Sequence, residues 1–300
     1  MSIAGTGLAA LCGVSAFTAG AGTAVAGGAA PGSVEGAVPS GASKSRMKLG
    51  LVTYNLAKDW DVPTIIKNCE ASGFEGVELR TTHAHGVEVS LSAQERGEVK
   101  KRFQDSHVQL MGLGSAFDYH TPDAAKLRKD IEDTKAYIQL AHDVGASGVK
   151  VRPNGLPKEV PVEKTLEQIG RSLQELGTFA QGLGLVIRLE VHGTGTSLVP
   201  RVARIMEVAN HASVGVCWNS NQSDLEGDGF DRNFDMVKSK ILSVHMRDLY
   251  LAEYPFRRLL TRLNEAGFGG YCLAEIGESK DPVRVMHYLR ALWLAYQGLL

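Results

Sequence analysis

From Met47 onward, a short apolar run rich in β-branched residues is followed by a polar turn and then by a segment with apolar residues at helical spacing. Repetition of this alternation predicts βα units, in which parallel strands are covered by helices. Eight strands are predicted, over residues 48–54, 76–80, 109–114, 148–152, 185–191, 214–218, 241–245 and 271–275. The clearest helices are predicted over residues 93–106, 124–144, 162–183, 200–209 and 282–296.

The number of these units predicts an α/β fold of the closed (β/α)8 TIM barrel type over residues 47–300. Such barrels typically take about 250 residues. An open doubly wound sheet would carry a glycine-rich phosphate-binding turn after its first strand. Here the first strand leads into Thr53-Tyr54-Asn55-Leu56, and Gly193–Ser197 runs into Leu198 without completing such a turn.

Residues 1–46 have a different composition from the rest of the chain. From Ser2 to Ala42 the residues are mostly small, and Glu35 is the single charge. The apolar run that starts at Ile3 ends in Ala24-Val25-Ala26, which has the small-x-small form of a signal-peptidase site. We therefore expect an export-type leader and a flexible linker, and a periplasmic location for the mature protein. A disordered low-complexity tail is the alternative. The glycines make the run weakly hydrophobic, so no stable membrane span is expected.

Composition narrows the function classes for the rest of the chain. The formal net charge is -1 and no long basic run occurs, which argues against a nucleic-acid partner. No Cys-x-x-Cys pair and no Gly-x-Ser-x-Gly elbow occurs, so a zinc ribbon, a redox motif and a serine hydrolase are not supported. A protein that acts on a small molecule remains, and a homo-oligomer is left open.

The active site of a (β/α)8 barrel lies at the carboxyl ends of its strands. The predicted strands five to eight each end close to a polar donor, namely Glu190, Asn219, His245 and Glu275. A carboxylate among apolar residues is costly unless it is paired or bound to a cation. Hard oxygens with one imidazole nitrogen suit Mn²⁺, Mg²⁺ or Zn²⁺. The pattern therefore indicates a divalent metal site at the barrel mouth.

The order Glu, short polar residue, His and Glu on strands five to eight resembles the xylose isomerase-like barrel family. This family includes ketose epimerases, hydroxypyruvate isomerases, inosose dehydratases and an apurinic endonuclease branch. The resemblance covers residues 47 to about 296 and is best at Gly76–Leu79, Val244-His245 and Ala274-Glu275.

The resemblance implies that Glu190, Asn219, His245 and Glu275 are metal ligands, and that Glu190 and Glu275 are the catalytic acid/base pair. The family usually has Asp at the strand-six position and His three residues later, where this chain has Asn219 and Gln222. Both replacements remove charge or basicity. We therefore expect weaker metal binding than in the usual site, through the carbonyl oxygen of Asn219.

The function that these residues indicate is a metal-dependent isomerase or epimerase acting on a sugar or keto-sugar. One glutamate would remove a proton next to a carbonyl, the metal would stabilise the enediolate, and the other glutamate would return the proton. A lyase or dehydratase would share the first step. A carbohydrate-binding barrel without turnover is the other alternative, suggested by Asn219 and Gln222. The endonuclease branch needs a richer ligand set and a basic groove.

Six further residues are candidates for substrate binding: Glu78, Lys150, His192, Gln222, Arg247 and Asp248. Lys150 and Arg152 alternate with Val149 and Val151, and one of these pairs points into the barrel; if it is the charged pair, it would contact an anionic or hydroxyl-rich substrate. Other candidates have an alternative interpretation or a subsidiary role. Glu78 would otherwise form a salt bridge with Arg80 or Lys150. His192 is expected to orient a metal ligand rather than to bind the ion. Arg247 and Asp248 would otherwise form a surface ion pair.

Two segments near the predicted mouth have no assigned role. Residues 224–235 have the spacing of a calcium loop, but Asp235 stands at the last position where Glu is usual, so we predict an acidic loop. The aromatic segment that contains Tyr250, Tyr254 and Phe256 would either stack on a sugar or pack over the barrel mouth.

Overall fold

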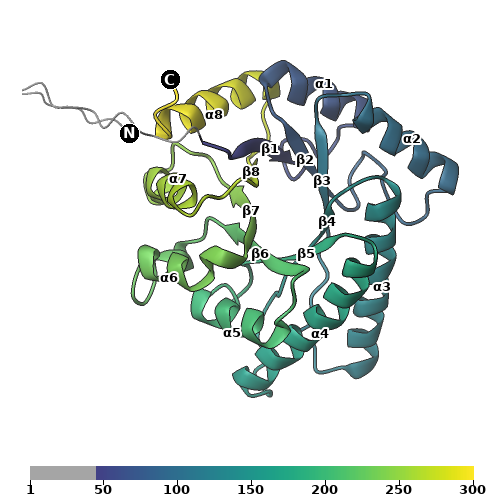
Figure 1. Cartoon of the computed structure of the whole chain (residues 1–300), viewed down its shortest axis with the longest axis vertical. Coiled ribbons are helices and arrows are strands. Elements are labelled where there is room, and N and C mark those ends of the chain that lie inside the picture. Colours follow the sequence, from purple (N-terminus) through teal and green to yellow (C-terminus); the bar gives the residue numbers. More distant parts are fainter. Residues whose placement is uncertain (1–44) are drawn as a thin grey trace, which may run out of the picture. The chain divides into compact units, whose positions relative to one another are not determined.

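A computed structural model of the protein describes residues 45–300. Eight parallel strands close into a barrel in the order β1 to β8, with β1 paired to both β2 and β8 (Figure 1). The strands are β1 (Lys48–Val52), β2 (Gly76–Arg80), β3 (Gln109–Gly114), β4 (Gly148–Val151), β5 (Val186–Glu190), β6 (Val214–Asn219), β7 (Ile241–Met246) and β8 (Tyr271–Ala274). This confirms the predicted (β/α)8 barrel.

The helices form an outer ring around the strands in Figure 1. They are α1 (Val62–Ser72), α2 (Ala93–Gln104), α3 (Ala124–Asp143), α4 (Val162–Gly182), α5 (Val199–Ala209), α6 (Phe230–Val237), α7 (Phe256–Glu265) and α8 (Pro282–Tyr296). Two short 3-10 helices, η1 (Gln222–Leu225) and η2 (Lys238–Lys240), flank α6.

The predicted strands and helices lie where expected, with ends that differ by one or two residues. The acidic loop predicted over residues 224–235 is wrong in its second half, because Phe230 begins helix α6. Phe230 and Phe234 are buried against Trp218, and Asp231 and Asp235 pair with Arg262 on α7. The carboxylates of this helix therefore contact arginine.

Local sequence signals explain several helix boundaries. The side chain of Asp61 accepts a hydrogen bond from the backbone N–H of Thr64 at 2.9 Å and begins α1. Ser92 and Glu95 form a reciprocal capping box at the start of α2. Gly73 ends α1 with a φ of 71°, in the left-handed region that glycine adopts without strain.

The main core lies between the strands and the helices, where side chains such as Ile65, Leu173 and Trp218 are fully buried. The interior of the barrel is different. Val52, Met111 and Leu273 form a small separate apolar cluster there. Leu273 lies two residues before Glu275, so both side chains share one face of β8. Inside the barrel, charged side chains such as Glu275 therefore lie nearer the carboxyl ends of the strands than this apolar cluster does.

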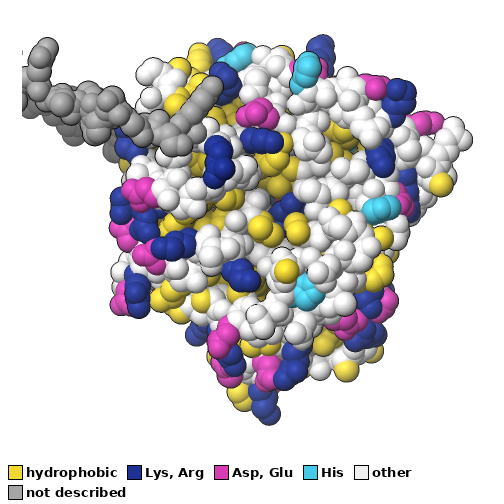
Figure 2. All heavy atoms as spheres, in the orientation of Figure 1, with side chains coloured by type: hydrophobic (Ala, Val, Ile, Leu, Met, Phe, Trp, Pro, Cys, Tyr) yellow, Lys and Arg dark blue, Asp and Glu magenta, His cyan; other side chains and the backbone are white. Residues whose placement is uncertain are grey.

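The outer surface carries mixed charge. Around the rim of the face in Figure 2, Lys and Arg side chains alternate with Asp and Glu, and many form ion pairs such as Arg128–Glu175 at 2.8 Å. Among residues 45–300, no helix has both the length and the apolar character needed to cross a membrane. The predicted leader and most of the linker lie outside the described residues.

Candidate active site

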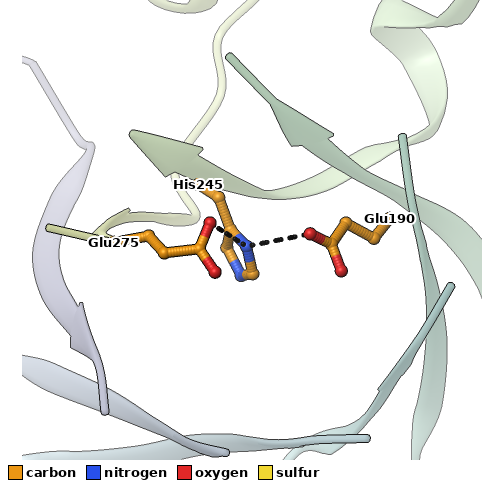
Figure 3. Close-up of side chains that lie close together, drawn as sticks. All are labelled: Glu190, His245 and Glu275. Carbon is orange, nitrogen blue, oxygen red and sulfur yellow. Dashed lines mark ion pairs between the residues drawn. The ribbon is translucent and has the colours of Figure 1, made fainter. Parts of the chain in front are cut away.

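Three predicted metal ligands converge at the carboxyl end of the barrel. Glu190 is the last residue of β5, His245 lies on β7, and Glu275 directly follows β8. One ligand atom from each residue lies within 4.8 Å of the others. Nδ1 of His245 is 3.7 Å from Oε1 of Glu190 and 3.6 Å from Oε2 of Glu275, and the two carboxylates face it from opposite sides (Figure 3).

The fourth predicted ligand, Asn219, ends β6 and is buried next to Glu190. Its Nδ2 donates a hydrogen bond to Oε1 of Glu190 at 3.3 Å. Its carbonyl oxygen would face a cation only if the side-chain amide rotated by 180°. The two orientations of an amide have nearly the same shape, so the site accommodates either one. Asn219 therefore supports the site by fixing Glu190 in the observed arrangement.

Lys150 on β4 contacts the other oxygen of Glu190. Its Nζ is 2.6 Å from Oε2 of Glu190 and 3.3 Å from the backbone oxygen of Ser115. Both side chains of this ion pair are almost fully buried, at 3% and 4% exposure. The Glu190 carboxylate is thus shared between an ammonium on one side and His245 with Asn219 on the other.

A further carboxylate lies deeper in the barrel. Oε1 of Glu78 on β2 is 3.3 Å from Nε2 of His245, and neither Glu78 oxygen has a hydrogen-bond partner among the described residues. No ion pair of Glu78 with Arg80 or Lys150 occurs within 4.0 Å in this part of the chain, so the salt bridge considered from the sequence does not form. A Cβ at Gly114 would lie 2.6 Å from Oε1 of Glu78, so glycine at this position leaves room for the carboxylate.

The buried charges hold one another ionised. Burial alone would raise the pKa of Glu190, but Lys150 and His245 lower it well below the ordinary value. Burial would lower the pKa of Lys150, but Glu190 and Glu78 raise it. Burial would likewise raise the pKa of Glu78, and His245 and Lys150 lower it. The inward charges are thus compensated within the barrel.

The surroundings of His245 favour the charged form of its imidazole. Burial would lower its pKa, but Cys217, Glu78 and Glu275 raise it well above the ordinary value. Metal binding requires a neutral imidazole, so a cation that binds here would displace a proton. Nδ1 of His245 is buried without a hydrogen-bond partner and faces two carboxylates, which fits a three-residue cation site with room for further ligands.

A cavity of about 320 Å³ opens above these residues. Its wall includes the predicted residues Lys150, Glu190, His192, Asn219, Arg247, Asp248 and Glu275. Gln222 is exposed at the start of η1 and does not belong to this wall. Arg247 forms no ion pair with Asp248 among the described residues. Instead its Nε donates to the backbone oxygen of Ser220 at 2.9 Å.

Burial also affects the polar residues of the cavity wall. It lowers the pKa of His192, which favours the neutral imidazole, and it raises the pKa of Asp248. Nδ1 of His192 has no hydrogen-bond partner among the described residues and is available to a ligand. The expected contact of His192 with a metal ligand does not occur at hydrogen-bond distance in residues 45–300.

The sequence interpretation did not assign Tyr54, Asn55 or Arg80 to the site, although all three line the cavity together with Arg152, which was expected there beside Lys150. The spacing that pointed to Arg152 was also present for Arg80. Arg80 lies two residues after Glu78, and Arg152 two residues after Lys150. Alternate residues of a strand share a face, so the inward position of one residue predicts that of the next but one.

Arg188 was also missed. It lies two residues before Glu190 on β5, is buried, and donates from Nη2 to Oγ of Ser147 at 2.7 Å. Gly112 and Gly148 leave the space around its guanidinium, because a Cβ at either position would lie 3.3 or 3.1 Å from Nη1 of Arg188. Arg188 therefore belongs to the charged interior below the site.

The aromatic segment after β7 packs behind the site. Tyr254 is buried, accepts a hydrogen bond from Nε1 of Trp218 at 2.9 Å and donates to Oδ2 of Asp224 at 2.7 Å. Asp224 Oδ2 also accepts from the backbone N–H of Asn221 at 3.0 Å. Burial raises the pKa of Asp224 to about 8. Tyr254 thus connects the loops after β6 and β7, and Tyr250 is exposed.

Comparison with known proteins agrees with the fold. The family model described as xylose isomerase-like TIM barrel matches residues 66–292. No curated protein matches the chain by sequence.

Solved structures with the same fold include a 3-keto-D-glucoside 4-epimerase from E. coli, which is 16% identical with a TM-score of 0.69, covering 83% of this chain and 99% of that protein. The IolI protein with a bound zinc atom is 16% identical with a TM-score of 0.71, and the match covers 84% of this chain and 98% of that protein. An L-ribulose 3-epimerase is 15% identical with a TM-score of 0.70, covering 84% and 95%. At these identities the likeness establishes the fold.

Proposed function

Because the chain belongs to the xylose isomerase-like TIM barrel family, we propose that it is an isomerase or epimerase that moves a proton between carbons of a sugar or keto-sugar. The observation that carries this proposal is the convergence of Glu190, His245 and Glu275, with ligand atoms within 4.8 Å of one another at the mouth of a closed barrel. Epimerases among the structural relatives support the same reaction class.

We propose that Glu190, His245 and Glu275 hold a divalent cation, with the oxygen of Asn219 as a fourth ligand after the amide turns over. Mn²⁺, Mg²⁺ and Zn²⁺ all suit such oxygen and imidazole ligands. The unpartnered Nδ1 of His245 supports the site, as does the zinc atom bound to the IolI protein. When bound, the cation would supply stabilisation of negative charge that develops on a carbonyl oxygen.

The two glutamates differ in their partners, and this suggests a division of roles. Glu190 is tied to Lys150 at 2.6 Å, which makes it a weak base. The Glu275 side chain is 20% exposed, lines the cavity and contacts no ammonium among the described residues. We therefore assign proton removal next to the carbonyl to Glu275. Glu275 would then carry this proton and could return it to the neighbouring carbon. Glu190 is ionised beside Lys150, so it would return a proton on another face only after taking one up from water in the cavity, to which Glu275 would release its own.

The test measures exchange of carbon-bound protons of a panel of ketoses for deuterium from D₂O. The loss of the proton signal is followed by NMR, with Mn²⁺ removed before detection. We expect exchange in the wild-type protein and its loss by about 10²-fold or more in Glu275→Gln, because the amide accepts no proton. Glu98→Gln, on the exposed surface of α2, is the matched control and should retain exchange.

Three outcomes distinguish the alternatives. Exchange with recovery of an isomerised sugar supports the proposal. Exchange with release of water or of a leaving group would indicate a lyase or dehydratase. Sugar-induced shifts in melting temperature without any exchange would contradict an enzyme and favour a carbohydrate-binding barrel.

A further inference from the structure

The polar residues of the cavity form two layers. The inner layer consists of Glu78, Lys150, Glu190, Asn219, His245 and Glu275. The outer layer consists of Arg80, Arg152, His192 and Arg247. Each outer residue lies two positions after an inner residue. Arg80 ends β2, and the other three lie just beyond the ends of β4, β5 and β7. All four line the cavity, and two residues of extended chain place them about 7 Å nearer its opening.

The outer layer is rich in guanidinium groups that have few partners. Within residues 45–300, no carboxylate lies within 4.0 Å of the Arg80 or Arg152 guanidinium, and Nε of Arg152 is buried without a hydrogen bond. The nearest carboxylate to Arg247 is Glu253, at 3.9 Å. These three arginines line the same cavity, so they repel one another in the absence of an anion.

Several arginines on the outer helices have carboxylate partners. Arg128 on α3 pairs with Glu175 at 2.8 Å, and Arg262 on α7 pairs with Asp235 at 2.7 Å. Others, such as Arg102 on α2 and Arg290 on α8, have no carboxylate within 4.0 Å among the described residues, but these two are exposed to water. In the cavity, Arg80 and Arg152 have no carboxylate within 4.0 Å among the described residues, and they line one wall together with Arg247, which is the arrangement of a site that receives an anion from a ligand.

The charge of the cavity points the same way. Its wall contains four basic residues, Arg80, Lys150, Arg152 and Arg247, and three acidic residues, Glu190, Asp248 and Glu275. Lys150 is already committed to Glu190. A divalent cation bound by the inner layer would raise the excess to three positive charges. An anionic group on the ligand would offset this excess of positive charge beside the arginines of the outer layer.

We infer that the substrate is an anionic sugar, whose carboxylate or phosphate is bound by Arg80, Arg152 and Arg247 in the outer layer. The reacting carbonyl would lie in the inner layer, about 7 Å away along the strand direction. The planar guanidinium fork binds both kinds of anion through paired hydrogen bonds. This inference rests on the proposed function, because it names the substrate class of the same site.

The test is equilibrium binding measured by titration calorimetry in the presence of Mn²⁺. The probes are D-glucuronate and D-fructose 6-phosphate, with D-glucose and D-fructose as their uncharged counterparts. We expect each anionic sugar to bind about tenfold or more tightly than its counterpart, the range for hydrogen bonds to charged groups. The probe with the larger advantage identifies the anion as carboxylate or phosphate.

Arg80→Gln and Arg152→Gln should each reduce this advantage by about tenfold, and Arg152→Lys should restore part of it. Arg102→Gln, on the exposed surface of α2, is the matched control and should leave it unchanged. Melting temperatures verify that each variant is folded. Equal affinity for charged and neutral sugars, no binding of either anionic sugar, or an advantage that survives in both arginine variants would overturn the inference.

Binding requires no proton transfer, so the two proposals fail separately. A protein that exchanges protons in neutral ketoses and shows no preference for anions would retain the proposed function and lose the substrate class. A protein that prefers anionic sugars and shows no exchange would retain the anion site and lose the enzyme.

Discussion

The inner and outer layers of the cavity differ in whether their charged side chains have partners of opposite charge. In the inner layer, Lys150 lies 2.6 Å from Glu190, and His245 lies within 3.7 Å of three carboxylates. In the outer layer, the one carboxylate within 4.0 Å of an arginine is Glu253, among the described residues. Charges that are compensated within the protein contribute to its stability, whereas uncompensated charges at a cavity opening are available to a ligand.

This difference follows from burial. A charge deep in the barrel has no water to solvate it, so it must have an opposite charge or a hydrogen bond. The Glu190 and Lys150 side chains are almost fully buried, whereas that of Arg247 is 39% exposed and retains water. Outer residues therefore tolerate the lack of a partner until a ligand arrives.

The strongest test of this comparison is Lys150→Met, which leaves Glu190 and Glu78 buried without an ammonium. We expect the free energy of unfolding to fall by about 3–5 kcal/mol, the usual cost of removing one member of a buried ion pair. Urea denaturation followed by circular dichroism measures this change. The double variant Lys150→Met with Glu190→Gln should recover much of the loss, because the unpaired carboxylate is gone. Additive losses would show that the pair is not coupled.

A second prediction concerns Asp224, a buried carboxylate with no ion pair within 4.0 Å among residues 45–300. Burial raises its pKa to about 8 in the folded protein, whereas in the unfolded chain it titrates near the ordinary value of 3.8. Between these values the folded state holds a proton that the unfolded state has lost. Its contribution to stability is therefore complete below about pH 4 and is lost as the pH rises toward 8.

For the wild-type protein, this group alone predicts a fall in the free energy of unfolding of roughly 2–3 kcal/mol between about pH 5 and pH 7. Asp224→Asn keeps the size of the side chain and removes the titration, so the slope should flatten. The measurement is urea denaturation at a series of pH values, with Asp281→Asn at the exposed start of α8 as the control. An unchanged slope in Asp224→Asn would contradict this assignment.

A third prediction addresses the cation site of the inner layer. Asn219→Asp adds a carboxylate beside Glu190, and we expect Mn²⁺ to bind about tenfold more tightly in titration calorimetry. Without metal, the new charge would face Oε1 of Glu190, where Nδ2 of Asn219 now donates at 3.3 Å. The metal-free variant should therefore melt at a lower temperature. Asn264→Asp on α7 is the surface control, and equal Mn²⁺ affinity would contradict our account of the site.

Much of this structure could be predicted from the sequence, because its signals are local. Strand and helix periods predicted the barrel, and the ends of β5 to β8 indicated Glu190, His245 and Glu275 as neighbours. The partner of Glu190 could not be predicted in this way. It depends on how far Lys150 reaches across β4 and β5, which no spacing along the chain encodes.

The outer layer was harder to predict for a second reason. Strands of a parallel barrel are buried on both faces, so the usual alternation of polar and apolar residues is weak. On β4, Val149, Lys150 and Val151 are all buried, and the inward face becomes evident only once one contact is known. Helix α6 was mistaken for a loop because its sequence is rich in acidic residues, and its two buried apolar residues, Phe230 and Phe234, are too few to indicate a helical period.

The smallest predicted effect concerns Arg152, which lies two residues after Lys150 and directly follows β4. Arg152→Gln removes a charge that has no carboxylate partner within 4.0 Å among the described residues, so the free energy of unfolding should change by about 0.5 kcal/mol or less. Lys150→Met, measured by the same urea denaturation, is the reference for a compensated charge.

A ligand should reverse this difference between the two positions. Inorganic phosphate should raise the melting temperature of the wild-type protein more than that of Arg152→Gln, because a ligand stabilises the folded state that binds it. A large loss of stability in Arg152→Gln would instead mean that the guanidinium supports the barrel, and the contrast between the two layers would then disappear.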